Sequence, residues 1–558
     1  MEKILFCNEG MPEDAWRILE RTAGKELDKR QIALAGEKES AGAYRVTVSV
    51  CRELKDDAFR LIPAPDGVSV EGASVCAVFH GTGVLLRRLR PDGRGGFTRL
   101  EKELFFTPEK PLRGIYFATH FHNFYHSAPL EAVYERVALS AMRGYNELLV
   151  WFDMHHYSSM EEPAAQKMVQ RLHKILAYAN TVGMGASMLH LANEGFDSSP
   201  VELRARFELE GGYRKIPLGH YNREICPSLP GGTEEILRER REMMRYFSDL
   251  RLDYLIYWPY DQGGCTCSAC QPWGGNGYLK LFAHYREMMR ELMPDTGLIL
   301  STWFFDHFTD GESEAFFAAV NRGELSDVAY VMSPKDVTGY AGWEKMKWIS
   351  FPEISMYQCA PWGGFGASQI AGALQSRLCG LREWIAGGFP YSEGIFEDAN
   401  EFMVAGFYTG EFRDMRQALR EYVAWEFCCG DEELFAAVLA TESTLKRRDE
   451  EVPGDACGVR YVIEDPAQVR FAWETFERYE KLLPEKITKG TPFRLFRLRT
   501  LIDHELVTHD FRPLASGECI RAMEEVDRLY YAESESSVWV RTPVWRIHPD
   551  QHPENTAV

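Results

Sequence analysis

Acidic residues lie close to tryptophan or tyrosine at four places in the sequence, each near the end of an apolar run. These residues are Asp153, Asp261, Asp306 and Glu393. Two carboxyl groups can act as acid and base, or as acid and nucleophile, in glycosidic bond hydrolysis, while aromatic rings hold the C–H faces of the sugar. The pattern therefore favours sugar hydrolysis, with Asp261 and Glu393 as the catalytic pair and Asp153 and Asp306 as reserves.

The roles of the two carboxyls stay open at this level. Asp261 could itself donate the proton, because burial near Trp258 and Tyr260 would raise its pKa. Glu393 could instead be the acid, with Asp261 as base or nucleophile. A separation of about 5 Å between the two carboxyls would indicate retention of the anomeric configuration, and about 6.5–9.5 Å would indicate inversion.

Other polar and aromatic residues near the ends of the same runs are candidate substrate contacts. They are His120, Asp153, His155, Trp258, Tyr260, Gln262, Trp303, Asp306, Tyr357 and Tyr391. Histidines gather after the first two runs, so a catalytic divalent metal is a second hypothesis. The later runs offer few matching ligands, with His307 after the fifth run and no histidine after the sixth. We therefore expect catalysis to require no cofactor.

Three cysteines stand at short spacing in the loop after the fourth apolar run. Cys265, Cys267 and Cys270 could supply three ligands to a structural Zn²⁺, with Cys226 or a histidine as the fourth. The alternative is a tight loop in which cysteine is only a small apolar side chain. In either case the loop would support the end of the fourth run and place Trp273 near the sugar.

Apolar strands alternate with amphipathic helices from Leu112 onward, which predicts parallel strands joined by helical crossovers. The strand candidates are Arg113–Phe121, Glu147–His155, Gly185–Leu191, Tyr254–Tyr260, Leu298–Phe305, Val328–Ser333, Ile349–Tyr357 and Gly387–Ile395. They predict a closed (β/α)8 TIM barrel over residues 111–410, with the reacting groups at the carboxyl ends of the strands. A doubly wound sheet would need a glycine-rich phosphate fingerprint, which the sequence lacks.

The regions before and after the barrel have different patterns. Residues 1–110 mix strands with helices and predict an N-terminal α+β domain, whereas residues 411–558 lose the strand signal and predict a C-terminal helical domain. The expected fold class is therefore α/β, a TIM barrel with these two additions. The helical domain could serve as a homodimer surface or as a wall of the sugar pocket.

Composition excludes several other classes of protein. The chain has 558 residues, and 63 Lys and Arg against 83 Asp and Glu give a formal charge of −20. Nucleic-acid binding is disfavoured because a phosphate backbone requires a basic face. No run approaches the about 18 apolar residues of a membrane span. Thirteen scattered cysteines and the lack of an evident export signal favour a cytoplasmic protein that acts on a carbohydrate.

Two segments carry a family resemblance: Pro111-Leu-Arg113-Gly-Ile-Tyr-Phe-Ala-Thr-His120-Phe, and Asn146-Glu-Leu-Leu-Val-Trp-Phe-Asp153. Together they resemble the first two barrel strands of glycoside hydrolase family 20, the β-N-acetylhexosaminidases. The stretch from Asp57 to Leu86 is similar to the α+β domain that precedes the barrel in those enzymes and in α-glucuronidases. The segment from Tyr391 onward looks more like the α-glucuronidases and related barrel glycosidases.

The resemblance implies roles for particular positions. Arg113 matches the family 20 arginine that grips hydroxyls of the terminal sugar, and His120 matches a sugar contact. Asp261 falls where family 20 carries an Asp-Glu pair, whose Asp orients the acetamido group and whose Glu is the general acid. This sequence has Gln262 in place of that Glu. Because Gln cannot donate a catalytic proton, the substrate-assisted mechanism cannot be carried over whole.

The expected function is hydrolysis of a terminal glycosidic bond in a small or partly degraded glycan. An N-acetylhexosaminide is the leading substrate class, because of Arg113 and Asp261. The likeness to α-glucuronidases makes an α- or β-glucuronide the alternative. Because of Gln262, the alternative outside catalysis is a carbohydrate-binding pseudoenzyme.

Overall fold

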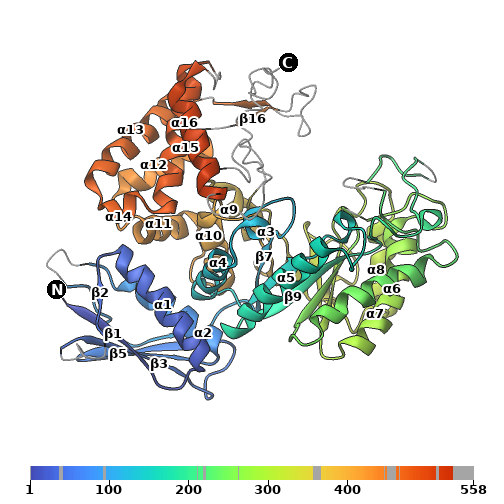
Figure 1. Cartoon of the computed structure of the whole chain (residues 1–558), viewed down its shortest axis with the longest axis horizontal. Coiled ribbons are helices and arrows are strands. Elements are labelled where there is room, and N and C mark those ends of the chain that lie inside the picture. The colour runs from blue at the N-terminus through green and yellow to red at the C-terminus, as the bar shows by residue number, and fades with distance from the viewer. Residues whose placement is uncertain are drawn as a thin grey trace.

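The computed structural model describes residues 2–36, 42–91, 96–209, 212–217, 222–261, 263–355, 366–444, 446–448, 460–463, 465–510 and 515–531. Figure 1 shows three parts in chain order: a sheet with two helices in blue, a barrel in cyan, green and yellow, and a group of helices in orange and red. Two predicted site residues, Gln262 and Tyr357, lie outside the described residues. Within the described ranges, no helix is both long and apolar enough to cross a bilayer.

The N-terminal part is a six-stranded sheet with the order β2-β1-β3-β5-β4-β6. Its elements are β1 (Lys3–Asn8), α1 (Glu13–Lys29), β2 (Ala33–Leu34), β3 (Tyr44–Val50), β4 (Phe59–Ala64), β5 (Gly67–Gly72), α2 (Val75–Arg88) and β6 (Leu104–Phe106). Strand β1 pairs in parallel with β2 and β3, and β3 pairs in parallel with β5. Strand β4 pairs antiparallel with β5 and β6. The expected α+β architecture is confirmed.

Helix α2 is buried along most of its length because it packs between this sheet and the barrel helix α4 (Leu130–Arg143). Two glycines allow this close approach. A Cβ atom at Gly81 would lie 3.0 Å from the ring of Phe59, and one at Gly83 would lie 2.1 Å from the carbonyl oxygen of Met142. The Gly-Thr-Gly sequence therefore serves the packing of the N-terminal domain against the barrel.

A closed parallel barrel forms the centre of the molecule. Its strands are β7 (Leu112–Phe117), β8 (Glu147–Trp151), β9 (Gly185–Leu191), β10 (Tyr254–Trp258), β11 (Gly297–Ser301), β12 (Tyr330–Ser333), β13 (Trp348–Ser350) and β14 (Ile385–Gly388), with a short extension β15 (Tyr391–Ser392). Closure occurs where Gly387 of β14 pairs with Leu112 of β7. A Cβ atom at Gly387 would lie 1.6 Å from the carbonyl oxygen of Leu112, so this contact requires glycine.

Helices cover the outside of the barrel. They are α3 (Phe124–Ser127), α4, α5 (Pro163–Thr181), α6 (Gly232–Met244), α7 (Lys280–Leu292), α8 (Glu312–Arg322), α9 (Ala371–Cys379) and α10 (Asp398–Thr409). The predicted strands start within two residues of the observed ones, but several run past the observed end. Left-handed backbone follows three of these strands within four residues of their ends, at Phe121, Asp261 and Phe304, so the chain turns away from strand geometry although aromatic residues continue the apolar run.

Four buried charges join α4 to α10. Arg136 and Arg143 each contact both Asp398 and Glu401. Burial alone would raise the pKa of Asp398, but the two guanidinium groups hold that pKa well below its usual range. Glu401 also accepts a hydrogen bond of 2.7 Å from the hydroxyl of Ser392 in β15. The network therefore fixes the end of the last barrel strand.

The C-terminal part is helical, as expected. It contains α11 (Met415–Glu426), α12 (Glu432–Ser443), a short hairpin of β16 (Lys446–Arg448) and β17 (Arg460–Val462), α13 (Pro466–Leu482), α14 (Glu485–Thr488), α15 (Thr491–Thr508) and α16 (Gly517–Tyr531). The hairpin was not predicted. Helix α16 ends against the barrel, where the ring of Tyr530 stacks on Phe396 with 4.6 Å between centroids.

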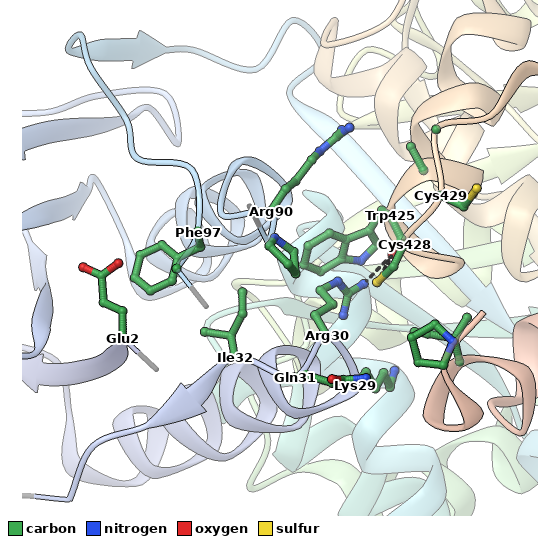
Figure 2. Close-up of a pocket in the computed structure, with 16 residues that line it drawn as sticks. Glu2, Lys29, Arg30, Gln31, Ile32, Arg90, Phe97, Trp425, Cys428 and Cys429 are labelled. Carbon is green, nitrogen blue, oxygen red and sulfur yellow. Dashed lines mark hydrogen bonds between the residues drawn. The ribbon is translucent and has the colours of Figure 1, made fainter. Parts of the chain in front are cut away.

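The N-terminal domain also contacts the C-terminal helices, around a cavity of about 470 Å³ (Figure 2). The guanidinium group of Arg30 lies 3.1 Å from the ring centroid of Trp425 and donates a hydrogen bond of 3.0 Å to the Trp425 carbonyl. The residues that line this cavity include none of the predicted site residues. The cavity is therefore part of the domain junction and is separate from the barrel mouth.

Candidate active site

The carboxyl end of the barrel is lined by aromatic rings. These rings belong to a cluster of buried apolar side chains inside the barrel, and they include Tyr116, Trp151, Trp258, Phe351 and Tyr391. The ring centroids of Trp258 and Phe351 are 4.9 Å apart, and those of Tyr116 and Tyr391 are 5.3 Å apart. They meet because inward-facing positions of neighbouring parallel strands form layers inside a closed barrel. The predicted contacts Trp258 and Tyr391 therefore lie at one mouth.

Asp261 follows β10 at this mouth. Its carboxylate accepts a hydrogen bond of 3.3 Å from the indole N–H of Trp258. Burial raises the pKa of Asp261 to about 6, against an opposing effect of the indoles of Trp258 and Trp303. Trp303, another predicted contact, has its ring centroid 5.5 Å from that of Trp258. Asp261 thus accepts a hydrogen bond from one indole and lies close to a second.

Glu393 follows β15 and is almost fully buried. Burial and the charge of Glu353 raise the pKa of Glu393 to about 7, although the hydroxyl of Tyr391 donates a hydrogen bond of 3.0 Å to its carboxylate. The Glu397 carboxylate fixes the backbone here by accepting hydrogen bonds from the N–H groups of Glu393 and Gly394. The side chain of Glu393 therefore starts from a rigid backbone.

A third carboxyl, Glu353, was missed by the sequence analysis. It follows β13, is partly exposed and pairs through a parallel bridge with Tyr391. Burial raises the pKa of Glu353 to about 7 against the opposing charge of Arg377, and the negative charges of Asp261 and Glu397 contribute to the increase. The predicted strand Ile349–Tyr357 ran past this residue. The sequence Phe351-Pro-Glu353 offered a signal, because proline ends a strand and an acid follows it.

Several carboxylates at the mouth lie near the hydroxyl of Tyr116. Burial raises its pKa well above the usual range, and the nearby carboxylates that add to the increase are Asp153, Glu194, Asp261 and Glu393. These residues follow strands two, three, four and eight of the barrel. The structure therefore brings the predicted pair Asp261 and Glu393 to the same end of the barrel, around Tyr116.

Two histidine–carboxylate pairs lie at the ends of strands two and three. Nδ1 of His155 is 2.7 Å from a carboxylate oxygen of Glu194, and Nδ1 of His156 is 2.6 Å from one of Asp153. Burial would lower the pKa of His156, but Asp153 raises it above the usual value. The predicted contacts Asp153 and His155 thus lie at the rim, whereas Glu194 was missed because the predicted third strand ended before Ala-Asn-Glu194.

His120 stands beside the aromatic lining, with its ring centroid 4.9 Å from that of Trp151 and 6.2 Å from that of Tyr391. Burial lowers the pKa of His120 to about 3, so the imidazole is neutral near pH 7. Its buried Nδ1 finds no hydrogen-bond partner among the described residues. A buried nitrogen of this kind suits a substrate hydroxyl, which would satisfy it.

The prediction that Arg113 contacts the sugar is wrong. Arg113 lies near the start of β7, at the end of the barrel opposite to the mouth, and is 3% exposed. Its guanidinium donates hydrogen bonds to the carbonyls of Gly144 (2.7 Å) and Lys110 (2.8 Å) and to the carboxylate of Asp57 (2.9 Å). All three are protein groups, so Arg113 joins the barrel to the N-terminal domain.

Three further expectations near the fourth and fifth strands need correction. The hydroxyl of Tyr260 is buried and donates a hydrogen bond of 2.5 Å to Glu312. Asp306 accepts from the backbone N–H of Glu312 at 2.8 Å and so caps helix α8. The indole N–H of Trp273 donates to the carbonyl of Pro259 at 2.7 Å in a fully buried position. These side chains hold the loops behind the mouth and do not line it.

The predicted cysteines do come together. Cys226, Cys265, Cys267 and Cys270 place their sulfur atoms within 4.8 Å of one another. Across the residues with described positions, no other group of three or more His, Cys, Asp or Glu side chains is arranged to share an ion. The histidines at the first two strand ends are paired with carboxylates instead.

No protein-family profile matches the chain, and no curated protein matches it in sequence. Solved structures do match. A family 89 glycoside hydrolase from Clostridium perfringens, in complex with PUGNAc, has a TM-score of 0.57 at 12% identity, over 92% of this chain and 65% of that chain. The present chain thus spans less than two thirds of the length of that enzyme.

Two other matches concern enzymes of different families. A family 138 glycoside hydrolase targeting pectin rhamnogalacturonan II has a TM-score of 0.57 at 9% identity, over 98% of this chain and 74% of that chain. A family 20 exo-β-N-acetylglucosaminidase from Vibrio harveyi, in complex with N-acetylglucosamine, has a TM-score of 0.49 at 14% identity, over 76% and 73% of the two chains. The family 89 and family 138 matches, both with a TM-score of 0.57, show that the chain shares the (β/α)8 fold of these glycoside hydrolases, and a helical region follows its barrel.

Proposed function

We propose that this protein is a glycosidase in which Asp261 and Glu353 are the reacting carboxyls. The observation that carries this proposal is the placement of both carboxyls after barrel strands at one aromatic mouth, Asp261 beside Trp258 and Glu353 bridged to Tyr391. Burial raises their pKa values to about 6 and about 7, and the charge of Asp261 makes a smaller contribution to the second increase. Between these values the pair holds one proton. One protonated and one ionised carboxyl are what glycosidic bond hydrolysis requires.

Glu353 is a better partner for Asp261 than the Glu393 of the sequence prediction. The side chain of Glu393 is buried, because the residue is only 6% exposed, and its carboxylate already accepts a hydrogen bond from the hydroxyl of Tyr391. Glu353, by contrast, is partly exposed. A reacting carboxyl must reach the bond that breaks. We therefore assign Glu393 to binding of a sugar hydroxyl, together with His120 and the aromatic lining.

An N-acetylhexosaminide remains the leading substrate class. The family 89 structure was also solved in complex with its substrate GlcNAc-α-1,4-galactose, in a variant with two glutamates replaced by glutamine, and matches this chain with a TM-score of 0.56. The carboxylates around Tyr116 add a second argument. They would repel the negative charge of a glucuronide, but not a neutral N-acetylated sugar.

Turnover of aryl glycosides tests the proposal. The panel contains α- and β-N-acetylglucosaminides, N-acetylgalactosaminides, glucuronides, galactosides and glucosides. On the best substrate, Asp261→Asn and Glu353→Gln should each lower kcat by about 10²–10⁴-fold, the size of a lost acid or base. Glu393→Gln should mainly raise KM. Asp310→Asn is the control, because Asp310 is an exposed carboxylate on the loop after β11.

Two outcomes would overturn the proposal. If Glu393→Gln abolishes turnover while Glu353→Gln preserves it, the carboxyl pair is Asp261 and Glu393. If the wild type binds N-acetylglucosamine by calorimetry but cleaves no member of the panel, the protein is a carbohydrate-binding pseudoenzyme.

A further inference from the structure

Four cysteine sulfurs lie together beside the loop that carries Asp261. Cys265, Cys267 and Cys270 come from the segment between β10 and α7, and Cys226 comes from the segment that leads into α6. Cys226, Cys265 and Cys270 are 2% exposed or less, and Cys267 is partly exposed. Two chain segments that are separate in the sequence thus converge on one buried point.

The spacing of the sulfur atoms fits a tetrahedral ion. The sulfur of Cys226 is 3.8 Å from that of Cys267 and 3.7 Å from that of Cys270. Zinc binds thiolate sulfur at about 2.3 Å, so the edges of a tetrahedral zinc–sulfur site measure about 3.8 Å. A disulfide requires about 2.05 Å between its sulfur atoms, and all four cysteines are free thiols.

We propose that Cys226, Cys265, Cys267 and Cys270 bind one structural Zn²⁺ ion. The structure selects Cys226 over a histidine as the fourth ligand, because its sulfur completes the set. Four thiolates fill a tetrahedral site and leave no position for water or substrate, so the ion is structural and takes no part in hydrolysis. The hydroxyl of Ser228 lies 3.1 Å from the sulfur of Cys270 and can donate to that thiolate.

The ion would tie together the loops that follow the third and fourth barrel strands. Asn193, after β9, already bridges them: its amide donates to the carbonyl of Ile225, and its oxygen accepts from the N–H of Gly264. Ile225 and Gly264 are the chain neighbours of Cys226 and Cys265. The ion would therefore hold these two loops together close to Asp261, which stands four residues before Cys265.

Metal analysis of the full-length protein tests this inference, which does not depend on the proposed activity. Protein purified without chelator from zinc-containing medium should contain one zinc per chain by elemental mass spectrometry. Cys267→Ser should lose that zinc. Cys51→Ser should retain it, because Cys51 is a partly exposed cysteine outside the cluster.

A second measurement on the wild type covers the case in which Cys267→Ser does not fold. Zinc is removed with chelator under reducing conditions, and Co²⁺ is added. The visible d–d bands and the sulfur-to-cobalt charge-transfer band of a tetrahedral thiolate site should saturate at one Co²⁺ per chain. The proposal would be overturned if the purified wild type contained only trace zinc, or iron in place of zinc. It would also be overturned if the cobalt-loaded wild type lacked these absorption bands, or if the Cys267→Ser variant kept its full zinc content.

Discussion

The hydroxyl of Tyr530 joins the last described helix to the backbone of Glu393. It accepts a hydrogen bond of 2.7 Å from the N–H of Phe124 and donates one of 2.7 Å to the carbonyl of Glu393. These two backbone groups follow the first and the last barrel strands. The C-terminal helical domain therefore supports the mouth of the barrel.

Replacing Tyr530 by Phe should weaken both the fold and the site. The change removes both hydrogen bonds of the hydroxyl, but the N–H of Phe124 still donates to the carbonyl of Glu393 at 3.1 Å, so neither group is left without a partner. The cost is therefore about the net worth of a hydrogen bond, about 0.5–1.5 kcal/mol for each one lost. Thermal unfolding should show a lower midpoint, and kcat on the best aryl glycoside should fall several-fold. Tyr340→Phe is the control, because Tyr340 is 39% exposed and lies away from the mouth. An unchanged midpoint for Tyr530→Phe would show that the bridge is not formed.

Arg113→Met should lower stability without changing the apparent affinity for substrate. Removal of the guanidinium takes a donor from the carbonyls of Gly144 and Lys110, and leaving buried polar groups unsatisfied costs about 1–3 kcal/mol. The carboxylate of Asp57 is partly exposed and keeps hydrogen bonds from Asn146 and Ser74, so its loss of the ion pair adds less. The measurements are the thermal midpoint and the KM of the best substrate. A raised KM at unchanged stability would restore the sugar-gripping role that the family resemblance implied.

The sequence predicted the barrel well because parallel strands buried on both faces appear as continuous apolar runs. It could not show where a side chain points. Arg113 and Asp57 are 56 residues apart in the chain, so nothing local revealed that they form an ion pair. Asp306 and Tyr260 follow apolar runs as Asp261 does, but the local backbone turns them onto Glu312 and away from the mouth. Glu353 was hidden inside a run of aromatic and apolar residues.

The activity should depend on pH through two carboxyls. Asp261 must be ionised while Glu353 keeps its proton, and their pKa values of about 6 and about 7 give a bell-shaped profile of kcat/KM with a maximum between them. Because the two groups interact, the apparent values belong to the pair. The check is kcat/KM against pH with an aryl glycoside whose leaving group needs protonation. A profile without the alkaline limb would contradict the role of a protonated carboxyl.

Trp258→Phe separates stacking from hydrogen bonding at the mouth. Phenylalanine keeps an aromatic face for the sugar but loses the indole N–H that donates to Asp261. Because that hydrogen bond favours the ionised carboxylate, its loss should raise the pKa of Asp261 and move the acidic limb of the profile to higher pH. Trp303→Phe should produce a shift in the same direction. An unmoved acidic limb in both variants would mean that another group controls it.

Glu353→Gln should stabilise the fold in a pH-dependent way while it abolishes turnover. Burial and Asp261 raise the pKa of Glu353 from 4.5 to about 7, so the unfolded chain releases this proton at lower pH than the folded chain does. The stability that the neutral carboxyl contributes is therefore complete below pH 4.5 and is lost as the pH rises through about 7. Glutamine stays neutral at every pH. The free energy of unfolding of the variant should therefore exceed that of the wild type by up to about 3 kcal/mol at pH 8 and should equal it near pH 4.5. Thermal midpoints at both pH values give the measurement, with exposed Glu344→Gln as the control. An equal difference at the two pH values would mean that the variant acts through packing, and that Glu353 is not held near neutrality by its surroundings.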